Sequence, residues 1–155
     1  MAVEPSDPAP DFKAPATGNQ TFSLSDFSDR ILVLYFYPRD NTPGCTQEGE
    51  GFRDIYPALQ QAGADVLGVS RDSLRKHENF RAKHAFPFDL ISDADERVCK
   101  AYGVLKEKNM YGRTHIGIER STFVIDTHGI IRYVWRGVKV ADHAQDVLQA
   151  VKAID

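Results

Sequence analysis

An unbroken run of apolar and aromatic residues at positions 31–37, ILVLYFY, limits the fold more than any other feature. A run of this length without alternation fits a central β-strand that is covered on both faces. Pro38 ends the run, and Pro43 and Gly44 bend the chain again before Cys45. Between residues 46 and 62, apolar residues then recur at helical spacing, with Cys45 in the first turn. The stretch therefore predicts a buried strand, a tight loop and a helix.

Strand and helix patterns continue to alternate along the next forty residues. We predict strands at Ala64–Ser70 and 88–92, and helices at Leu74–His84 and Arg97–Tyr102. Gly63 and Gly103 supply helix stops. Candidate helix caps are Ser25, Asp72 or Ser73, Asp93 or Asp95, and Asp142. Two strand-helix-strand units of this kind place their strands in parallel in one sheet.

The two ends of the chain complete this plan. Residues 1–20 contain four prolines and predict an extended arm anchored by Phe12. Residues 104–119 lack a sustained period, so we expect a long loop there. Residues 121–126 and 130–136 predict a hairpin, and an apolar stripe follows in a last helix. We expect one α/β domain over residues 1–155, with a mixed central sheet and helices on both faces.

Composition excludes several classes of protein. The net charge is −3 and no dense basic cluster is present, which argues against nucleic-acid binding. No apolar stretch approaches the roughly 18 residues of a membrane span, and the acidic, proline-rich N-terminus is unlike a signal peptide. Two cysteines are too few for a disulfide scaffold. A cytoplasmic protein with reduced thiols is the simplest interpretation.

The loop before the predicted helix is suited to thiol chemistry. The start of a helix has unpaired N–H groups and a partial positive charge, and both favour a thiolate on Cys45 over a thiol. The Thr42 hydroxyl can donate one hydrogen bond and accept others. Pro38 and Pro43 stiffen the loop. The five histidines lack metal-ligand spacing with either cysteine, so we predict no metal, and the chemistry requires no cofactor.

Pro38, Thr42 and Cys45 stand in the order P-x-x-x-T-x-x-C, followed by Glu48. This pattern resembles the peroxiredoxins. The wider YPRDNTPGCTQE, together with KEKNMYGRTHIGIERSTFVID at 106–126, is similar to the bacterioferritin comigratory protein or PrxQ branch. The resemblance extends from Pro10 to the C-terminal helix and implies a thioredoxin-like fold. It also implies a thiol-dependent peroxidase that reduces hydrogen peroxide and organic hydroperoxides.

The resemblance assigns roles to five residues. Thr42, Arg120 and the Cys45 N–H would hold the two peroxide oxygens in line with the Cys45 thiolate, and Pro38 would shield the sulfur from solvent. Glu48 would orient an arginine through a charge-assisted hydrogen bond. The product would be a sulfenic acid on Cys45, which a second thiol must reduce.

The sequence departs from common PrxQ patterns at this second step. Relatives place a resolving cysteine where this chain has Glu50 or Arg81. We therefore expect a one-cysteine cycle in which glutathione, glutaredoxin or thioredoxin reduces Cys45. Cys99 lies in a predicted amphipathic helix and is interpreted as a packing residue, with an atypical two-cysteine cycle as the alternative. PrxQ proteins are often monomers, and we expect the same state here.

Other interpretations of the same residues stay open. Cys45 could be a buried structural cysteine, Thr42 a turn residue, Glu48 a helix-start charge, and Arg120 a surface ion-pair partner. A thioredoxin-like disulfide reductase would need a C-x-x-C pair, and Glu48 occupies the second position. A non-catalytic binding or chaperone domain would retain the fold without needing the Cys45 thiol.

Overall fold

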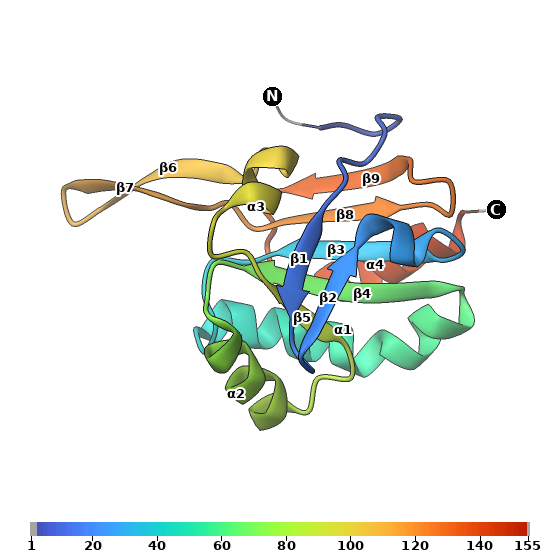
Figure 1. The fold of residues 1–155 in the computed structure, drawn as a ribbon, viewed down its shortest axis with the longest axis horizontal. Helices are drawn as coiled ribbons and strands as arrows, with labels where there is room; N and C mark the ends of the chain where they lie inside the picture. The colour runs from blue at the N-terminus through green and yellow to red at the C-terminus, as the bar shows by residue number, and fades with distance from the viewer. Residues whose placement is uncertain (1–2, 155) are drawn as a thin grey trace.

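The computed structural model describes residues 3–154. Figure 1 shows a central twisted sheet with helices packed against it and a hairpin that extends to one side. The seven strands of the sheet follow the order β2-β1-β5-β4-β3-β8-β9, and β6 and β7 form a separate pair. The strands are β1 (Lys13–Ala16), β2 (Gln20–Ser23), β3 (Ile31–Phe36), β4 (Ala64–Ser70), β5 (Asp89–Ser92), β6 (Leu105–Met110), β7 (Arg113–Ile118), β8 (Ser121–Ile125) and β9 (Ile131–Arg136). The helices are η1 (Leu24–Phe27), α1 (Pro43–Gln61), α2 (Leu74–His84), α3 (Arg97–Tyr102) and α4 (His143–Lys152).

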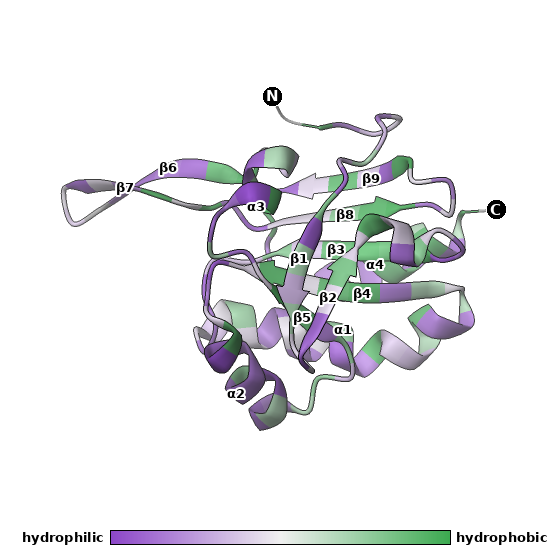
Figure 2. Cartoon of the chain, viewed as in Figure 1, coloured by the Kyte–Doolittle hydropathy of each residue, from purple (hydrophilic) through white to green (hydrophobic). Residues whose placement is uncertain are grey.

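The central strand confirms the prediction from the apolar run. All six residues of β3 are buried. The strand pairs in parallel with β4 and antiparallel with β8, and β4 pairs in parallel with β5. The predicted mixed sheet is therefore confirmed. In Figure 2, β3 and β4 carry long hydrophobic stretches, whereas α2 is mostly hydrophilic.

Alternate residues of β3 contribute to two hydrophobic layers, one on each face of the sheet. Val33 and Tyr35 belong to the layer that contains residues of α1 and α4. Leu34 and Phe36 belong to the layer that contains residues of η1, α3 and the N-terminal segment. Helices on both faces were predicted and are confirmed. None of the helices within residues 3–154 combines the length and apolar character needed to cross a bilayer.

Most helix boundaries agree with the sequence. The bounds of α2 and α3 are as predicted, and α1 begins at Pro43, slightly earlier than expected. A proline is favoured at this position because the first helical N–H has no intrahelical acceptor. Ser73 caps α2 by accepting a hydrogen bond from the Lys76 N–H. The predicted cap Ser25 was wrong, because Ser23 is the N-cap of η1. Asp142 is the N-cap residue of α4 as predicted, but its side chain makes no capping bond.

The arm predicted for residues 1–20 was partly wrong. Phe12 is buried as expected, but β1 and β2 form an antiparallel pair that joins the sheet beside β5. Pro15 lies inside β1, opposite Thr21. The strands have four residues each, and proline cannot donate to a ladder, so the sequence pattern gave little indication of them.

The loop predicted for residues 104–119 was also wrong. Here β6 and β7 form an antiparallel hairpin with paired residues from Leu105 and Ile118 to Met110 and Arg113. Its turn residues, Tyr111 and Gly112, both have positive φ angles, which suits a two-residue hairpin turn. The first four residues of β7 are exposed, so the alternation of apolar and polar residues that would indicate a strand is absent.

Candidate active site

Cys45 lies in the first turn of α1, just after the carboxyl end of β3. Its side chain is buried, with 2% exposed. The Thr46 N–H bonds the Thr42 carbonyl at 2.9 Å, whereas the preceding amides of Gly44 and Cys45 have no intrahelical acceptor. The sulfur therefore lies at the positive end of a helix dipole, and the predicted position of Cys45 is confirmed.

Arg120 reaches Cys45 because β8 runs antiparallel to β3. Phe36 at the end of β3 pairs with Ser121 at the start of β8, which places Arg120 beside the start of α1. Its Nη2 donates to Cys45 Sγ at 3.4 Å, and its Nη1 donates to Glu48 Oε1 at 2.7 Å. The structure thus brings together three of the predicted site residues, although they are separated by up to 75 positions.

Gly44 allows this close approach of the guanidinium to the helix. A Cβ at position 44 would lie 3.1 Å from Arg120 Nη2, which is closer than ordinary van der Waals contact. A larger residue would displace the guanidinium or the helix start. The glycine therefore contributes to the geometry of the site, a role that the sequence analysis missed.

Glu48 is almost completely buried, and its second oxygen, Oε2, has no hydrogen-bond partner among the described residues. Burial raises the pKa of Glu48 to about 7, although the Arg120 charge and hydrogen bond oppose this shift. The Tyr35 hydroxyl is likewise buried and has no hydrogen-bond partner within residues 3–154. Burial, with the nearby Glu48 and Cys45 charges, raises the pKa of Tyr35 well above its usual value, so the phenol stays neutral.

Pro38 and Thr42, from the loop that precedes Cys45 in the chain, line a groove. The other residues of this groove are Arg39, Arg71, Lys108, His115, Gly117 and Ile118. The Thr42 hydroxyl donates to the Arg39 carbonyl at 2.8 Å, which leaves its oxygen lone pairs free to accept. Four of these residues, Lys108, His115, Gly117 and Ile118, belong to the β6–β7 hairpin. Lys108 and His115 were not among the predicted site residues, because a loop was expected over residues 104–119.

Cys99 lies on the opposite face of the sheet from Cys45. Cys99 belongs to the layer with α3, and Cys45 to the layer with α1. Cys99 is completely buried, and its N–H donates to Asp93 Oδ2 at 2.8 Å. Burial and the Asp93 carboxylate raise the pKa of the Cys99 thiol far above its usual value. These surroundings are typical of a packed, unreactive cysteine.

Comparisons with known proteins agree with this geometry. Residues 5–134 match the model of the AhpC/TSA family. Peroxiredoxin Bcp of Xanthomonas campestris is 52% identical over 149 residues, which cover 94% of this chain and 92% of that protein.

Solved structures give the same result. A structure of X. campestris bacterioferritin comigratory protein, described for its alkyl peroxide reduction activity, has a TM-score of 0.88 at 49% identity and covers 92% of this chain and 90% of its own. A variant of Xylella fastidiosa PrxQ has a TM-score of 0.94 at 45% identity, and the match covers 99% of this chain and 98% of that protein. The chain therefore belongs to the AhpC/TSA family, in the Bcp/PrxQ branch of the peroxiredoxins.

Proposed function

We propose that the Cys45 thiolate reduces hydrogen peroxide and organic hydroperoxides. The thiolate attacks one peroxide oxygen and the O–O bond breaks. Cys45 becomes a sulfenic acid, and the second oxygen leaves, after gaining a proton, as water or an alcohol. The observation that carries this proposal is the Arg120 guanidinium, which donates to both Cys45 Sγ and Glu48 Oε1.

The proposed role of Arg120 follows from the charge that develops in the reaction. Negative charge moves from the sulfur to the leaving oxygen, so a fixed cation and aligned N–H donors stabilise the transition state more than the ground state. Arg120 and the Cys45 N–H are the donors we assign to this task. The Thr42 hydroxyl, whose hydrogen is donated to the Arg39 carbonyl, would accept a hydrogen bond from the peroxide O–H and so orient the substrate. Glu48 holds the guanidinium in place, and Pro38 limits access of water to the sulfur.

Organic hydroperoxides are included in the proposed substrates for two reasons. The X. campestris relative is described as reducing alkyl peroxides. In addition, the groove that Pro38 and Thr42 line offers the apolar ring of Pro38, against which an alkyl group could pack. An alkyl group in this groove would leave the peroxide oxygens next to the start of α1.

We propose a one-cysteine cycle for the return to the thiol. An external thiol attacks the Cys45 sulfenic acid and releases water, and a second thiol cleaves the mixed disulfide. Cytoplasmic glutathione, glutaredoxin or thioredoxin could supply these thiols. The position of Cys99 across the sheet and its Asp93 contact disfavour an internal resolving step. A monomer suffices for the reaction, because all assigned residues belong to one chain.

The test compares Cys45→Ser with the unchanged protein and with Cys99→Ser as the matched control. We expect Cys45→Ser to abolish peroxide consumption in the presence of glutathione and glutaredoxin, because it removes the nucleophile. Cys99→Ser should retain it. Stopped-flow mixing with hydrogen peroxide gives the rate of the first step. An unchanged protein that reacts no faster than free cysteine would refute the proposed function.

A further inference from the structure

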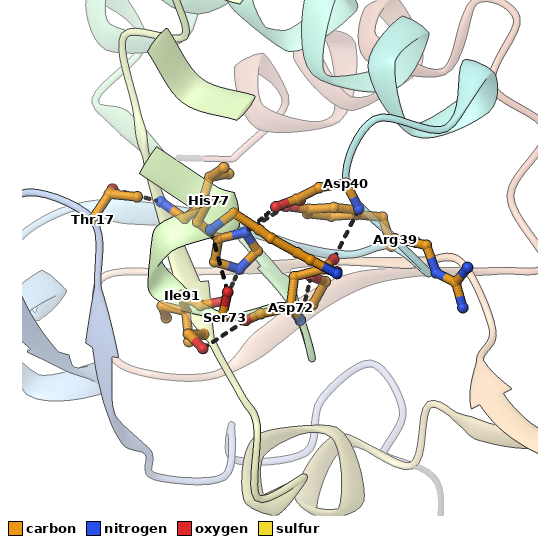
Figure 3. Close-up of polar contacts among 12 residues, drawn as sticks. Thr17, Arg39, Asp40, Asp72, Ser73, His77 and Ile91 are labelled. Atoms are coloured by element: carbon orange, nitrogen blue, oxygen red, sulfur yellow. Dashed lines mark hydrogen bonds and ion pairs between the residues drawn. The ribbon is translucent and has the colours of Figure 1, made fainter. Parts of the chain in front are cut away.

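A buried polar network lies behind the loop that carries Thr42, outside the groups assigned so far. Asp40, in this loop, is 5% exposed, and His77 of α2 is completely buried. Asp40 Oδ2 lies 2.6 Å from His77 Nδ1, and the Tyr37 hydroxyl donates to Asp40 Oδ1 at 2.6 Å. Figure 3 shows the Asp40 and His77 side chains pointing toward one another, with Arg39 directed away from them.

The partners of the His77 ring determine where its protons lie. Nε2 is 2.9 Å from the Ile91 carbonyl oxygen, which can only accept, so Nε2 carries a hydrogen. The short contact between Nδ1 and Asp40 Oδ2 also needs a proton between its two atoms. The pair therefore holds one shared proton, and the Asp40 carboxyl is fixed between the Tyr37 hydroxyl and His77.

A second set of contacts holds the backbone of the same loop. The Asp40 N–H donates to Asp72 Oδ2 at 2.8 Å, and the Ser70 hydroxyl donates to the same oxygen at 2.7 Å. Asn41 follows with a φ angle of 62°, in the left-handed region that asparagine adopts more readily than most other non-glycine residues. Thr42, the next residue, ends the loop where α1 begins.

The same side chains could suggest a metal site, because ligand atoms of Asp40, Asp72 and His77 lie within 4.8 Å of one another. Hydrogen bonds already account for these atoms. Asp72 Oδ2 accepts from two donors, and His77 Nδ1 shares a proton with Asp40. A metal ion would have to displace these hydrogen bonds. The arrangement therefore fits a hydrogen-bonded link between the loop and α2 better than a metal centre.

We infer that His77 is a positioning residue for the peroxide reaction, acting through Asp40 on the loop that presents Thr42 and Pro38 beside Cys45. This inference rests on the proposed function of Cys45. His77 links the loop to α2 and, through the Ile91 carbonyl, to β5. Without that link, the Asp40 carboxylate would be buried without a counterion and the loop would shift to expose it to water. Displacements of about 1 Å can slow an aligned reaction by roughly 100-fold.

The experiment measures two rates for Cys45, one with hydrogen peroxide and one with iodoacetamide. Peroxide reduction needs the aligned loop, whereas alkylation needs only an accessible thiolate. We expect His77→Leu to slow the peroxide reaction by about 10- to 100-fold while alkylation changes little. Asp40→Asn should slow the peroxide reaction much less than His77→Leu does. The introduced amide can donate a hydrogen bond to a neutral His77 and still accept one from Tyr37. His84→Leu, the same change elsewhere on α2, is the matched control.

A further variant keeps the test valid if His77→Leu fails to fold. The double change Asp40→Asn with His77→Leu removes the unpaired carboxylate but leaves the loop without its link to α2, so the selective loss of peroxide reactivity should persist. Equal losses in both rates, or normal peroxide reactivity in folded His77 variants, would overturn the inference. If the unchanged protein itself reacts slowly with peroxide, the proposed function fails instead.

Discussion

The two cysteines occupy matching positions in their helices but have opposite surroundings. Cys45 is the third residue of α1 and Cys99 is the third residue of α3, and both are buried. A guanidinium contacts Cys45, with Arg120 Nη2 at 3.4 Å from the sulfur. A carboxylate faces the start of α3, where Asp93 accepts the N–H groups of Val98 at 3.1 Å and Cys99 at 2.8 Å.

This difference teaches that a helix start does not by itself make a cysteine reactive. The dipole is worth about 0.3–1 kcal/mol for a nearby charge. A full charge at a few ångströms in a buried site outweighs it. Asp93 takes up the free amides of α3 and opposes a second negative charge, whereas Arg120 adds a positive charge to the start of α1. The charged neighbour of the helix start therefore distinguishes the surroundings of the two thiols.

Removal of the guanidinium should have the largest effect on this contrast. We expect Arg120→Ala to slow the reaction of Cys45 with hydrogen peroxide by about 10² to 10³, the usual loss for one donor to a developing anion. Arg120→Lys is the control, because it keeps the positive charge but loses the bidentate contact with Cys45 and Glu48. Its rate should lie between the rates of Arg120→Ala and the unchanged protein. A stopped-flow rate for Arg120→Ala equal to that of the unchanged protein would remove Arg120 from the mechanism.

Glu48 gives a smaller effect, visible in the pH dependence of stability. Burial raises its pKa to about 7, so folded Glu48 keeps a proton at pH values where the carboxyl of the unfolded chain, with a pKa near 4.3, has lost it. The folded state then binds more protons, and the free energy of unfolding falls as pH rises from about 4.3 to 7 and levels off above that. The slope is at most about 1.4 kcal/mol per pH unit.

Urea unfolding of the unchanged protein and of Glu48→Gln between pH 5 and pH 8 measures this effect. The glutamine cannot ionise, so the stability of the unchanged protein relative to the variant should decline with rising pH. A relative stability that instead increases with pH would mean that Arg120 lowers the pKa of Glu48 more than burial raises it.

Substitution of the second thiol should have the smallest effect. We expect Cys99→Ser to keep the full peroxide rate and full turnover with glutathione and glutaredoxin, because Cys99 and Cys45 lie in layers on opposite faces of the sheet. Mass spectrometry of the unchanged protein after one equivalent of peroxide should find a Cys45 sulfenic acid or its glutathione adduct. An intramolecular disulfide between the two cysteines would contradict the one-cysteine cycle.

The parts of the fold that the sequence predicted well are those with continuous burial. All six residues of β3 are buried, and the bounds of β4 match its apolar run. The mostly exposed helix α2 was predicted from a different signal, the Ser73 cap at its start. The β6–β7 hairpin was missed because most of β7 is exposed, so no burial pattern marks it. The short strands β1 and β2 are held by their place beside β5, which local sequence does not encode.

The site was predictable only in part. The loop and helix start follow from local sequence, and the resemblance to a family supplied Arg120, whose approach depends on the pairing of β3 with β8. The contact between His77 and Asp40 crosses 37 positions and joins residues of different elements. A search for metal-ligand spacing around the cysteines does not consider such a pair.

The start of β8 has a further consequence for the newly made protein. While the ribosome is still producing the chain, Cys45 emerges 75 residues before the arginine that contacts it. Until β8 pairs with β3, the contact between Arg120 and the Cys45 sulfur cannot form. We therefore expect the peroxide reactivity proposed for Cys45 to appear only after β8 has paired with β3.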